Sequence, residues 1–138
     1  ISEEISIGNL LSRRIDDILK KLANKKVIIY GAGEHTAQLF KETRMGEANI
    51  TAIIDKDPAK WGTLINNIKV FSPEDDIKKG VEVVIISSYS FQEEIYEYLS
   101  GDPEWSRLEI IRLYDSADEE KSGDEESIGR QLKNLGYL

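Results

Sequence analysis

The chain has 138 residues, an apolar fraction of 40% and a formal net charge of −8 at pH 7. This length and composition predict one globular domain with its own core, and the acidic charge argues against nucleic acid and anionic membranes as partners. The sequence has no cysteine, which excludes disulfides and cysteine-ligated metals. Because no apolar run approaches the roughly 18 residues of a membrane span and no signal peptide opens the chain, a cytoplasmic protein is expected.

The first 24 residues are predicted to form an amphipathic helix. Leu11, Ile15, Ile18 and Leu22 recur at the spacing that places them on one helical face. A helix with such an apolar stripe must bury it. Because the later helices are expected to cover the sheet of their own chain, this stripe is predicted to contact a second copy in a two-fold homodimer.

Residues 25–115 alternate between short apolar runs and helical patterns. The runs are rich in β-branched residues, which is typical of strands that are covered on both faces. Strands are predicted over residues 27–30, 50–55, 68–71, 81–88 and 108–115, and helices over residues 34–43, 72–80 and 90–101. This order predicts a Rossmann-like α/β/α fold in three layers, with a five-stranded parallel sheet in the order 3-2-1-4-5.

Residues 116–138 are predicted to be an acidic linker followed by a short helix. The stretch DSADEEKSGDEE has no large apolar residue, so it is expected to be solvated. Ile128, Leu132 and Leu135 then recur at helical spacing. The chain begins with Ile1 and not with Met, and we expect it to be one part of a longer protein that carries other domains.

The stretch YGAGEHT is typical of a phosphate-binding loop between a strand and a helix. Gly31 would permit the tight turn, and Gly33, next to Ala32, would let the backbone approach a phosphate at the helix N-terminus. Thr36 stands where a dinucleotide fingerprint has its third glycine, and is expected to hold helix and strand slightly apart. Asp55 follows at about the distance expected of a ribose-binding acid. The alternative is that the glycines only make a tight turn and bind nothing.

Four further residues are candidates for the same site. Glu34 would place a carboxylate at the helix start, where it competes with a phosphate for the positive end of the helix dipole. His35, the only histidine, is expected either to bind a ligand as a neutral imidazole or to lie exposed on the surface. Ser87 and Ser88 end a strand at the carboxyl edge, where open α/β sheets bind ligands, or they begin the next turn.

Three stretches resemble a known group of domains: VIIYGAGEHTAQLF, AIIDKDPAKWGTLINNIKVFSPEDD and VVIISSYSFQEEIYEYL. They resemble the Rossmann-like nucleotide-binding domains of sugar-modifying and polysaccharide-biosynthesis proteins, over residues 25–114. One relative is the N-terminal domain of sugar acyltransferases of the sialic-acid O-acetyltransferase type, and similar modules are appended to methyltransferases and glycosyltransferases. The acyltransferase loop reads glycine-x-glycine-glycine-histidine-alanine, so this chain matches it at Gly31, Gly33 and His35 and departs from it at Glu34 and Thr36.

The resemblance implies a module that binds a nucleotide sugar within a larger carbohydrate-modifying enzyme. Acyl transfer in that family depends on a left-handed β-helix domain, and no hexapeptide repeat is present in this sequence. We therefore expect binding without autonomous catalysis, and no catalytic or metal-ligating residue is predicted. Two other interpretations stay open: an NAD(P)-binding domain of an oxidoreductase or epimerase-like protein, and a ligand-free Rossmann-like domain that serves association.

Overall fold

The computed structural model describes residues 2–114, so the predicted acidic linker and terminal helix lie outside the described residues. The helices are α1 (Ser2–Leu22), α2 (Glu34–Glu42) and α3 (Gln92–Gly101), with short 3-10 helices η1 (Arg44–Glu47), η2 (Pro58–Lys60) and η3 (Trp105–Arg107). The strands are β1 (Lys26–Tyr30), β2 (Asn49–Ile54), β3 (Leu64–Ile65), β4 (Ile68–Phe71), β5 (Val83–Ile86) and β6 (Glu109–Arg112). None of the helices in this part of the chain is long and apolar enough to cross a membrane.

The sheet has the order β3-β4-β2-β1-β5-β6. The pairs β4–β2, β2–β1, β1–β5 and β5–β6 are all parallel, which confirms the predicted five-stranded parallel order. The sixth strand, β3, was not predicted and pairs antiparallel with β4. Asn66 and Asn67 connect β3 to β4, both with positive φ (51° and 66°), as in the two-residue turns that favour asparagine.

The predicted helix over residues 72–80 is wrong, because this segment forms turns. The Ser72 hydroxyl accepts a hydrogen bond from the Glu74 backbone N–H (3.2 Å), and the Asp75 carboxylate accepts one from the Ser72 N–H (3.0 Å). Short polar side chains that bond to nearby backbone in this way compete with helix formation. The connection from β4 to β5 therefore contains no helix.

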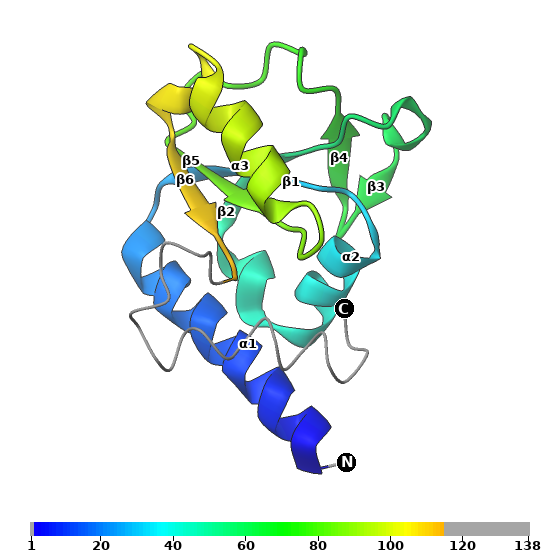
Figure 1. Ribbon diagram of the computed structural model, residues 1–138, viewed down its shortest axis with the longest axis vertical. Helices are drawn as coiled ribbons and strands as arrows, with labels where there is room; N and C mark the ends of the chain where they lie inside the picture. The colour runs from blue at the N-terminus through cyan, green and yellow to red at the C-terminus, as the bar shows by residue number, and fades with distance from the viewer. Residues whose placement is uncertain (1, 115–138) are drawn as a thin grey trace.

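Two apolar clusters lie on opposite faces of the sheet. Alternate residues of β1 divide between them, since Val27 and Ile29 belong to one cluster and Ile28 and Tyr30 to the other. The first cluster joins the sheet to α1, α2 and η1, and the second joins it to α3 and η3. The result is the predicted three-layer α/β/α arrangement, with α3 on one face and α1 and α2 on the other (Figure 1).

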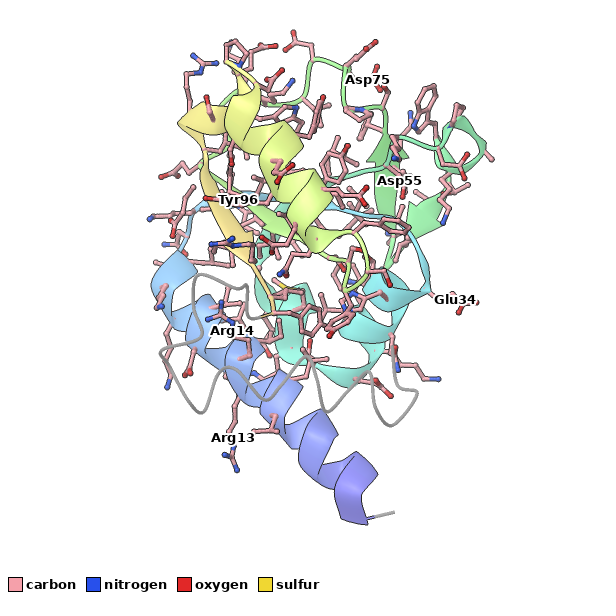
Figure 2. All side chains as sticks on the ribbon, in the orientation of Figure 1. Arg13, Arg14, Glu34, Asp55, Asp75 and Tyr96 are labelled. Carbon is pink, nitrogen blue, oxygen red and sulfur yellow. The ribbon has the colours of Figure 1, made fainter. Side chains whose placement is uncertain are left out.

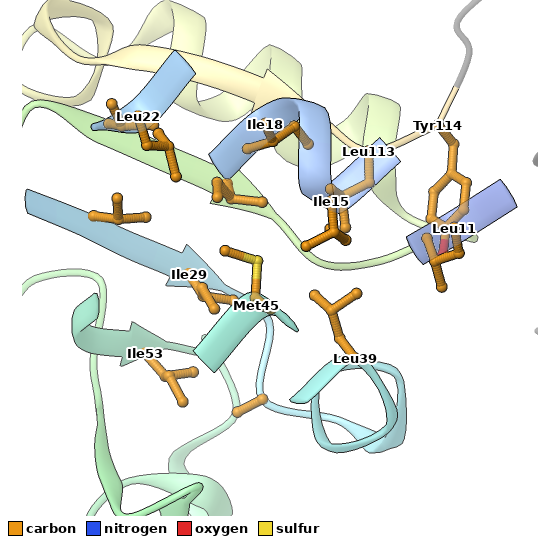
Figure 3. Packing of buried hydrophobic residues seen from close by; sticks show 14 of the residues in the cluster. Leu11, Ile15, Ile18, Leu22, Ile29, Leu39, Met45, Ile53, Leu113 and Tyr114 are labelled. Carbon is orange, nitrogen blue, oxygen red and sulfur yellow. The ribbon is translucent and has the colours of Figure 1, made fainter. Parts of the chain in front are cut away.

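The stripe of α1 is part of the intrachain core. Leu11, Ile15, Ile18 and Leu22 are all buried, and Figure 3 shows them packed toward Leu113, Met45 and the sheet. The guanidinium of Arg14 also donates to the backbone carbonyl of Arg112 in β6 (2.8 Å), which places α1 beside this edge. The expectation that the stripe contacts a second copy is therefore wrong. The stripe is buried within the chain because α2, which connects β1 to β2, covers only part of this face of the sheet. The part formed by β5 and β6 is covered by α1.

Candidate functional site

The glycine loop lies at the point where the strand order reverses. From β1 the chain proceeds to β2 and β4 on one side, and β5 and β6 lie on the other. Ligands of open α/β sheets bind at such a switch point, outside the carboxyl ends of the strands. Gly31 has φ +123°, and a Cβ at this residue would lie 2.6 Å from the backbone oxygen of Ser87. Both the backbone angle and the close approach therefore require glycine here.

Gly33 has a different role, because its backbone conformation is one that any residue can adopt. It is the N-cap residue of α2, with φ −94°, and the atom nearest to an added Cβ is Lys60 Nζ at 3.7 Å. Among residues 10–114, the backbone N–H groups of Gly33, Glu34 and His35 have no hydrogen-bond acceptor. These are the free donors that a helix N-terminus offers to an anion.

The sequence suggested only that Thr36 holds helix and strand apart, but in the structure its side chain also forms hydrogen bonds to the loop. Its side chain is fully buried, and the hydroxyl lies 2.6 Å from the Gly31 carbonyl oxygen and 2.7 Å from Ser87 Oγ. A threonine hydroxyl has one proton, and a carbonyl oxygen can only accept. Thr36 therefore donates to the Gly31 carbonyl and accepts from the Ser87 hydroxyl, and these two hydrogen bonds hold the glycine loop against the end of β5.

His35 continues this chain of hydrogen bonds and is not an exposed surface residue. Its Nδ1 lies 2.8 Å from Ser87 Oγ, and its Nε2 contacts the hydroxyl of Tyr114. Since Ser87 donates to Thr36, the imidazole carries its proton on Nδ1 and accepts from Tyr114 at Nε2. Burial lowers the pKa of His35 to about 4, so the ring is neutral at pH 7.

Asp55 also braces the loop. One carboxylate oxygen accepts from the Ala32 backbone N–H (2.9 Å), and the other accepts from the Asp57 N–H (2.9 Å). The residue predicted to bind ribose thus already holds two backbone donors, although each of its oxygens has a further lone pair. Ser88 has a turn role, because its hydroxyl accepts from the backbone N–H of Phe91 (3.1 Å) just before α3.

A cleft of about 900 Å³ opens above the loop. All eight predicted site residues line it: Gly31, Ala32, Gly33, Glu34, His35, Asp55, Ser87 and Ser88. The structure brings these residues together, and their binding roles stay predictions. The volume of the cleft lies within the range of small-molecule sites in proteins.

Several residues at the rim of this cleft were not among the predicted site residues. Trp61, Phe91 and Tyr98 line it with side chains that are 41%, 58% and 46% exposed. Lys60 lines it as well, and its Nζ donates to the Ala32 carbonyl (3.3 Å). Trp61 follows a turn sequence, which was a weak signal for a residue that covers a crevice. Nothing in the sequence marks Lys60, because its proximity to the loop depends on the path after β2.

The cleft is acidic on balance. Two lysines line it, against five carboxylates: Glu34, Asp55, Asp57, Glu74 and Glu94. Figure 2 shows Glu34 pointing outward from the start of α2, and it shows Asp55 at the end of β2. Burial, followed by the nearby Tyr98 and Asp55, raises the pKa of Tyr30 to about 12, so this cleft residue stays neutral. In the described part of the chain, no group of His, Cys, Asp and Glu residues is arranged to hold a metal ion.

Comparison with solved structures shows the Rossmann-like fold. The chain is 31% identical to a UDP-D-quinovosamine 4-dehydrogenase from Vibrio fischeri, with a TM-score of 0.51, over 78% of this chain and 90% of that one. It is 16% identical to RSP, a Rex-family repressor, with a TM-score of 0.48, over 88% and 69% of the two chains. RSP in complex with β-NAD⁺ and operator DNA gives 16% identity and a TM-score of 0.40, over 88% and 67%. At this level neither RSP structure bears on ligand or partner.

Comparison with curated protein sequences finds no match. The family described as C2185-like, N-terminal, matches residues 23–102, which is more than half of the chain. The matched segment runs from the end of α1 to the end of α3 and includes the glycine loop and Asp55. The chain belongs to the C2185-like N-terminal family.

Proposed function

We propose that the cleft binds a nucleotide-type small molecule, with a nucleotide sugar as the favoured ligand, and that the chain is a binding module of a carbohydrate-modifying system. The observation that carries this proposal is the coincidence of two chemistries in one cleft. Unpaired backbone N–H groups at the start of α2 suit a phosphate. Exposed aromatic rings at the rim suit a flat base or a sugar ring.

The distribution of exposed aromatic residues supports a ligand with a planar group. Within residues 10–114, where side-chain exposure is described, four large hydrophobic side chains are exposed, and three of them line this cleft: Trp61, Phe91 and Tyr98. The fourth, Leu64, lies on β3 and does not line it. Exposed apolar groups that gather at one place mark binding sites. Stacking of one base on an aromatic ring contributes about 1–3 kcal/mol.

The similarity to the Vibrio fischeri protein supports the same ligand class. That protein is named for an activity on a UDP-sugar, and this chain covers 90% of it at 31% identity. A uridine nucleotide sugar is therefore the first ligand to test. NAD(P) binding is the second candidate, and it is favoured by the glycine loop together with Asp55 at the end of β2.

The state of His35 supports binding without autonomous acid–base catalysis. Its two ring nitrogens are both hydrogen-bonded within the protein, and its pKa lies near 4. A general base works best when its pKa lies near the working pH. His35 is the only histidine in the chain, so the cleft has no other imidazole.

A titration of the protein with UDP-sugars, UDP, NAD⁺, NADH and coenzyme A tests the proposal. Calorimetry gives the affinity, and the thermal midpoint gives an independent readout, because a ligand at 100 times its dissociation constant stabilises the folded state by about 2.7 kcal/mol. We expect UDP or a UDP-sugar to bind. Binding of none of these compounds would overturn the proposal.

Two matched variants locate the ligand. Phe91→Ala and Leu64→Ala each remove a large exposed side chain, 58% and 62% exposed respectively, but only the first lines the cleft. Phe91→Ala should weaken UDP binding by about tenfold through lost stacking. Leu64→Ala should leave the affinity unchanged. Equal effects of the two changes would place the ligand outside this cleft.

A further inference from the structure

Lys60 lies beside the glycine loop although it comes from the connection after β2. Its Nζ donates to the Ala32 carbonyl at 3.3 Å and lies 3.7 Å from the position of a Cβ on Gly33. The ammonium group therefore lies next to the start of α2, where the backbone N–H groups of residues 33–35 have no acceptor among the described residues. This position is the one that a ligand phosphate would share under the proposed function.

The ammonium of Lys60 has charge and donors to spare. Among residues 10–114, whose side chains the structure describes, it forms no ion pair at 4.0 Å or less, although Asp55 and Asp57 are close in sequence. Those two carboxylates accept backbone N–H groups instead: Asp55 from residues 32 and 57, and Asp57 from residue 59. A lysine ammonium has three donors, and in the described part of the chain only the bond to the Ala32 carbonyl is formed.

The cleft needs such a cation if it is to hold a diphosphate. Five carboxylates line it against two lysines, so its balance is unfavourable for an anion. Of the two, Lys60 touches the loop, whereas Lys56 is exposed and makes no hydrogen bond or ion pair within the described residues. Without Lys60, a phosphate bound to the loop amides would be repelled by these carboxylates, and no positive charge beside the loop would offset the repulsion.

We infer that Lys60 is the residue that neutralises the ligand phosphates at the glycine loop, so that the cleft prefers nucleoside diphosphates over nucleosides. The inference rests on the proposed function and names the group that gives it phosphate selectivity. The donors that the bond to the Ala32 carbonyl leaves free would bind phosphate oxygens, and in those hydrogen bonds both partners carry a charge.

The test compares Lys60→Met with Lys56→Met, using UDP and uridine as probes in calorimetry. Both changes remove one positive charge from a lysine of the same cleft, and methionine keeps most of the apolar stem. Lys60→Met should weaken UDP binding by about tenfold and leave uridine within about twofold of the wild type. Lys56→Met should change neither ligand by more than about twofold. Lys60→Arg should recover most of the UDP affinity, since it restores the charge.

Each alternative result has a separate meaning. If Lys60→Met binds UDP as tightly as the wild type, Lys60 has no phosphate role, and the proposed function stands without it. An equal loss of UDP and uridine affinity in Lys60→Met would overturn the inference too, because the residue would then act by shaping the loop. If the wild-type protein binds neither probe, the uridine-nucleotide form of the proposed function fails together with the inference.

Discussion

Two regions meet at the glycine loop, and they differ in how many of their polar groups already have a hydrogen-bond partner. The buried network, which includes the half-buried His35 and lies at the base of the cleft, consists of Thr36, His35, Ser87, the Tyr114 hydroxyl and the Gly31 carbonyl. The cleft rim, which faces solvent, consists of Lys60, Trp61, Phe91 and Tyr98. Both regions contain residue types that bind ligands in other proteins, so residue type alone does not separate them.

The two regions differ in the number of hydrogen-bond donors that have an acceptor. In the buried network every proton has one acceptor, from Tyr114 through His35, Ser87 and Thr36 to the Gly31 carbonyl. At the rim, Lys60 uses one donor of three, and the aromatic rings are exposed. The network therefore fixes the shape of the loop, and the rim provides the groups that can meet a ligand. The following predictions test this division, from the largest expected effect to the smallest.

Gly31→Ala should destabilise the fold at the buried network. The φ of +123° disfavours any side chain, and the new Cβ would lie 2.6 Å from the Ser87 carbonyl oxygen. Strain and overpacking together should lower the free energy of unfolding by about 3 kcal/mol or more, as measured by urea denaturation.

Gly33→Ala is the matched control, because Gly33 has an ordinary φ of −94° and only Lys60 Nζ lies near its added Cβ. Its free energy of unfolding should stay within about 1 kcal/mol of the wild type, even if ligand affinity falls. Equal destabilisation by the two changes would mean that the close packing of Gly31 against Ser87 does not stabilise the loop.

Thr36→Val keeps the shape of a buried side chain and removes its hydroxyl. The Ser87 hydroxyl and the Gly31 carbonyl then lose their partner, which should cost about 1–3 kcal/mol of stability in denaturant unfolding. Thr63→Val is the control, since the Thr63 hydroxyl bonds the Lys60 carbonyl at an exposed position. That change should cost no more than about 0.5 kcal/mol. A smaller loss for Thr36→Val than for Thr63→Val would contradict the network.

The pH dependence of stability should report the burial of His35. Its pKa falls from 6.5 to about 4 on folding, so between these values the unfolded chain binds a proton that the folded chain does not. The stability that this group contributes is therefore fully present above pH 6.5 and is lost as the pH drops through this window. The loss between pH 7 and pH 5 should be about 2 kcal/mol.

His35→Gln isolates this contribution, because the chain has no other histidine. The variant should be less stable at pH 7 and should lack most of the loss between pH 7 and pH 5. Parallel stability curves for the two proteins over this range would show that the imidazole is not buried in its neutral form.

Much of the fold could be predicted from local sequence patterns. Unbroken β-branched runs and glycine punctuation gave the five parallel strands and their order. The hairpin strand β3 was missed because it has two residues and depends on the turn at Asn66 and Asn67. The helix expected at residues 72–80 failed because Ser72 and Asp75 bond to their own turn. In each case a side chain or turn of a few residues decided the outcome.

The burial of α1 could be predicted, but its partner could not. Periodicity shows that Ile15 and Ile18 lie on one face, whereas the surface that covers them depends on which half of the sheet lacks a helix. In the candidate site, the loop and Asp55 were found from spacing. The contact between His35 and Tyr114 joins residues 79 positions apart, and the approach of Lys60 to Ala32 joins residues 28 apart. Such contacts follow from the folded path, and no local pattern marks them.

Glu34→Gln should have the smallest effect and should act with opposite signs on stability and binding. Glu34 is the first residue of α2, is exposed and points outward (Figure 2). A carboxylate at a helix N-terminus stabilises the helix by about 0.3–1 kcal/mol and competes with a phosphate to a similar extent. The variant should therefore unfold at slightly lower urea concentration and yet bind UDP about two- to fivefold more tightly, with uridine unaffected. Glu97→Gln, an exposed change on α3 away from the cleft, removes the same charge and should do neither. If both variants tighten UDP binding equally, the effect belongs to net charge and the helix start of α2 is not where the phosphate lies; if Glu34→Gln weakens binding, Glu34 contacts the ligand favourably.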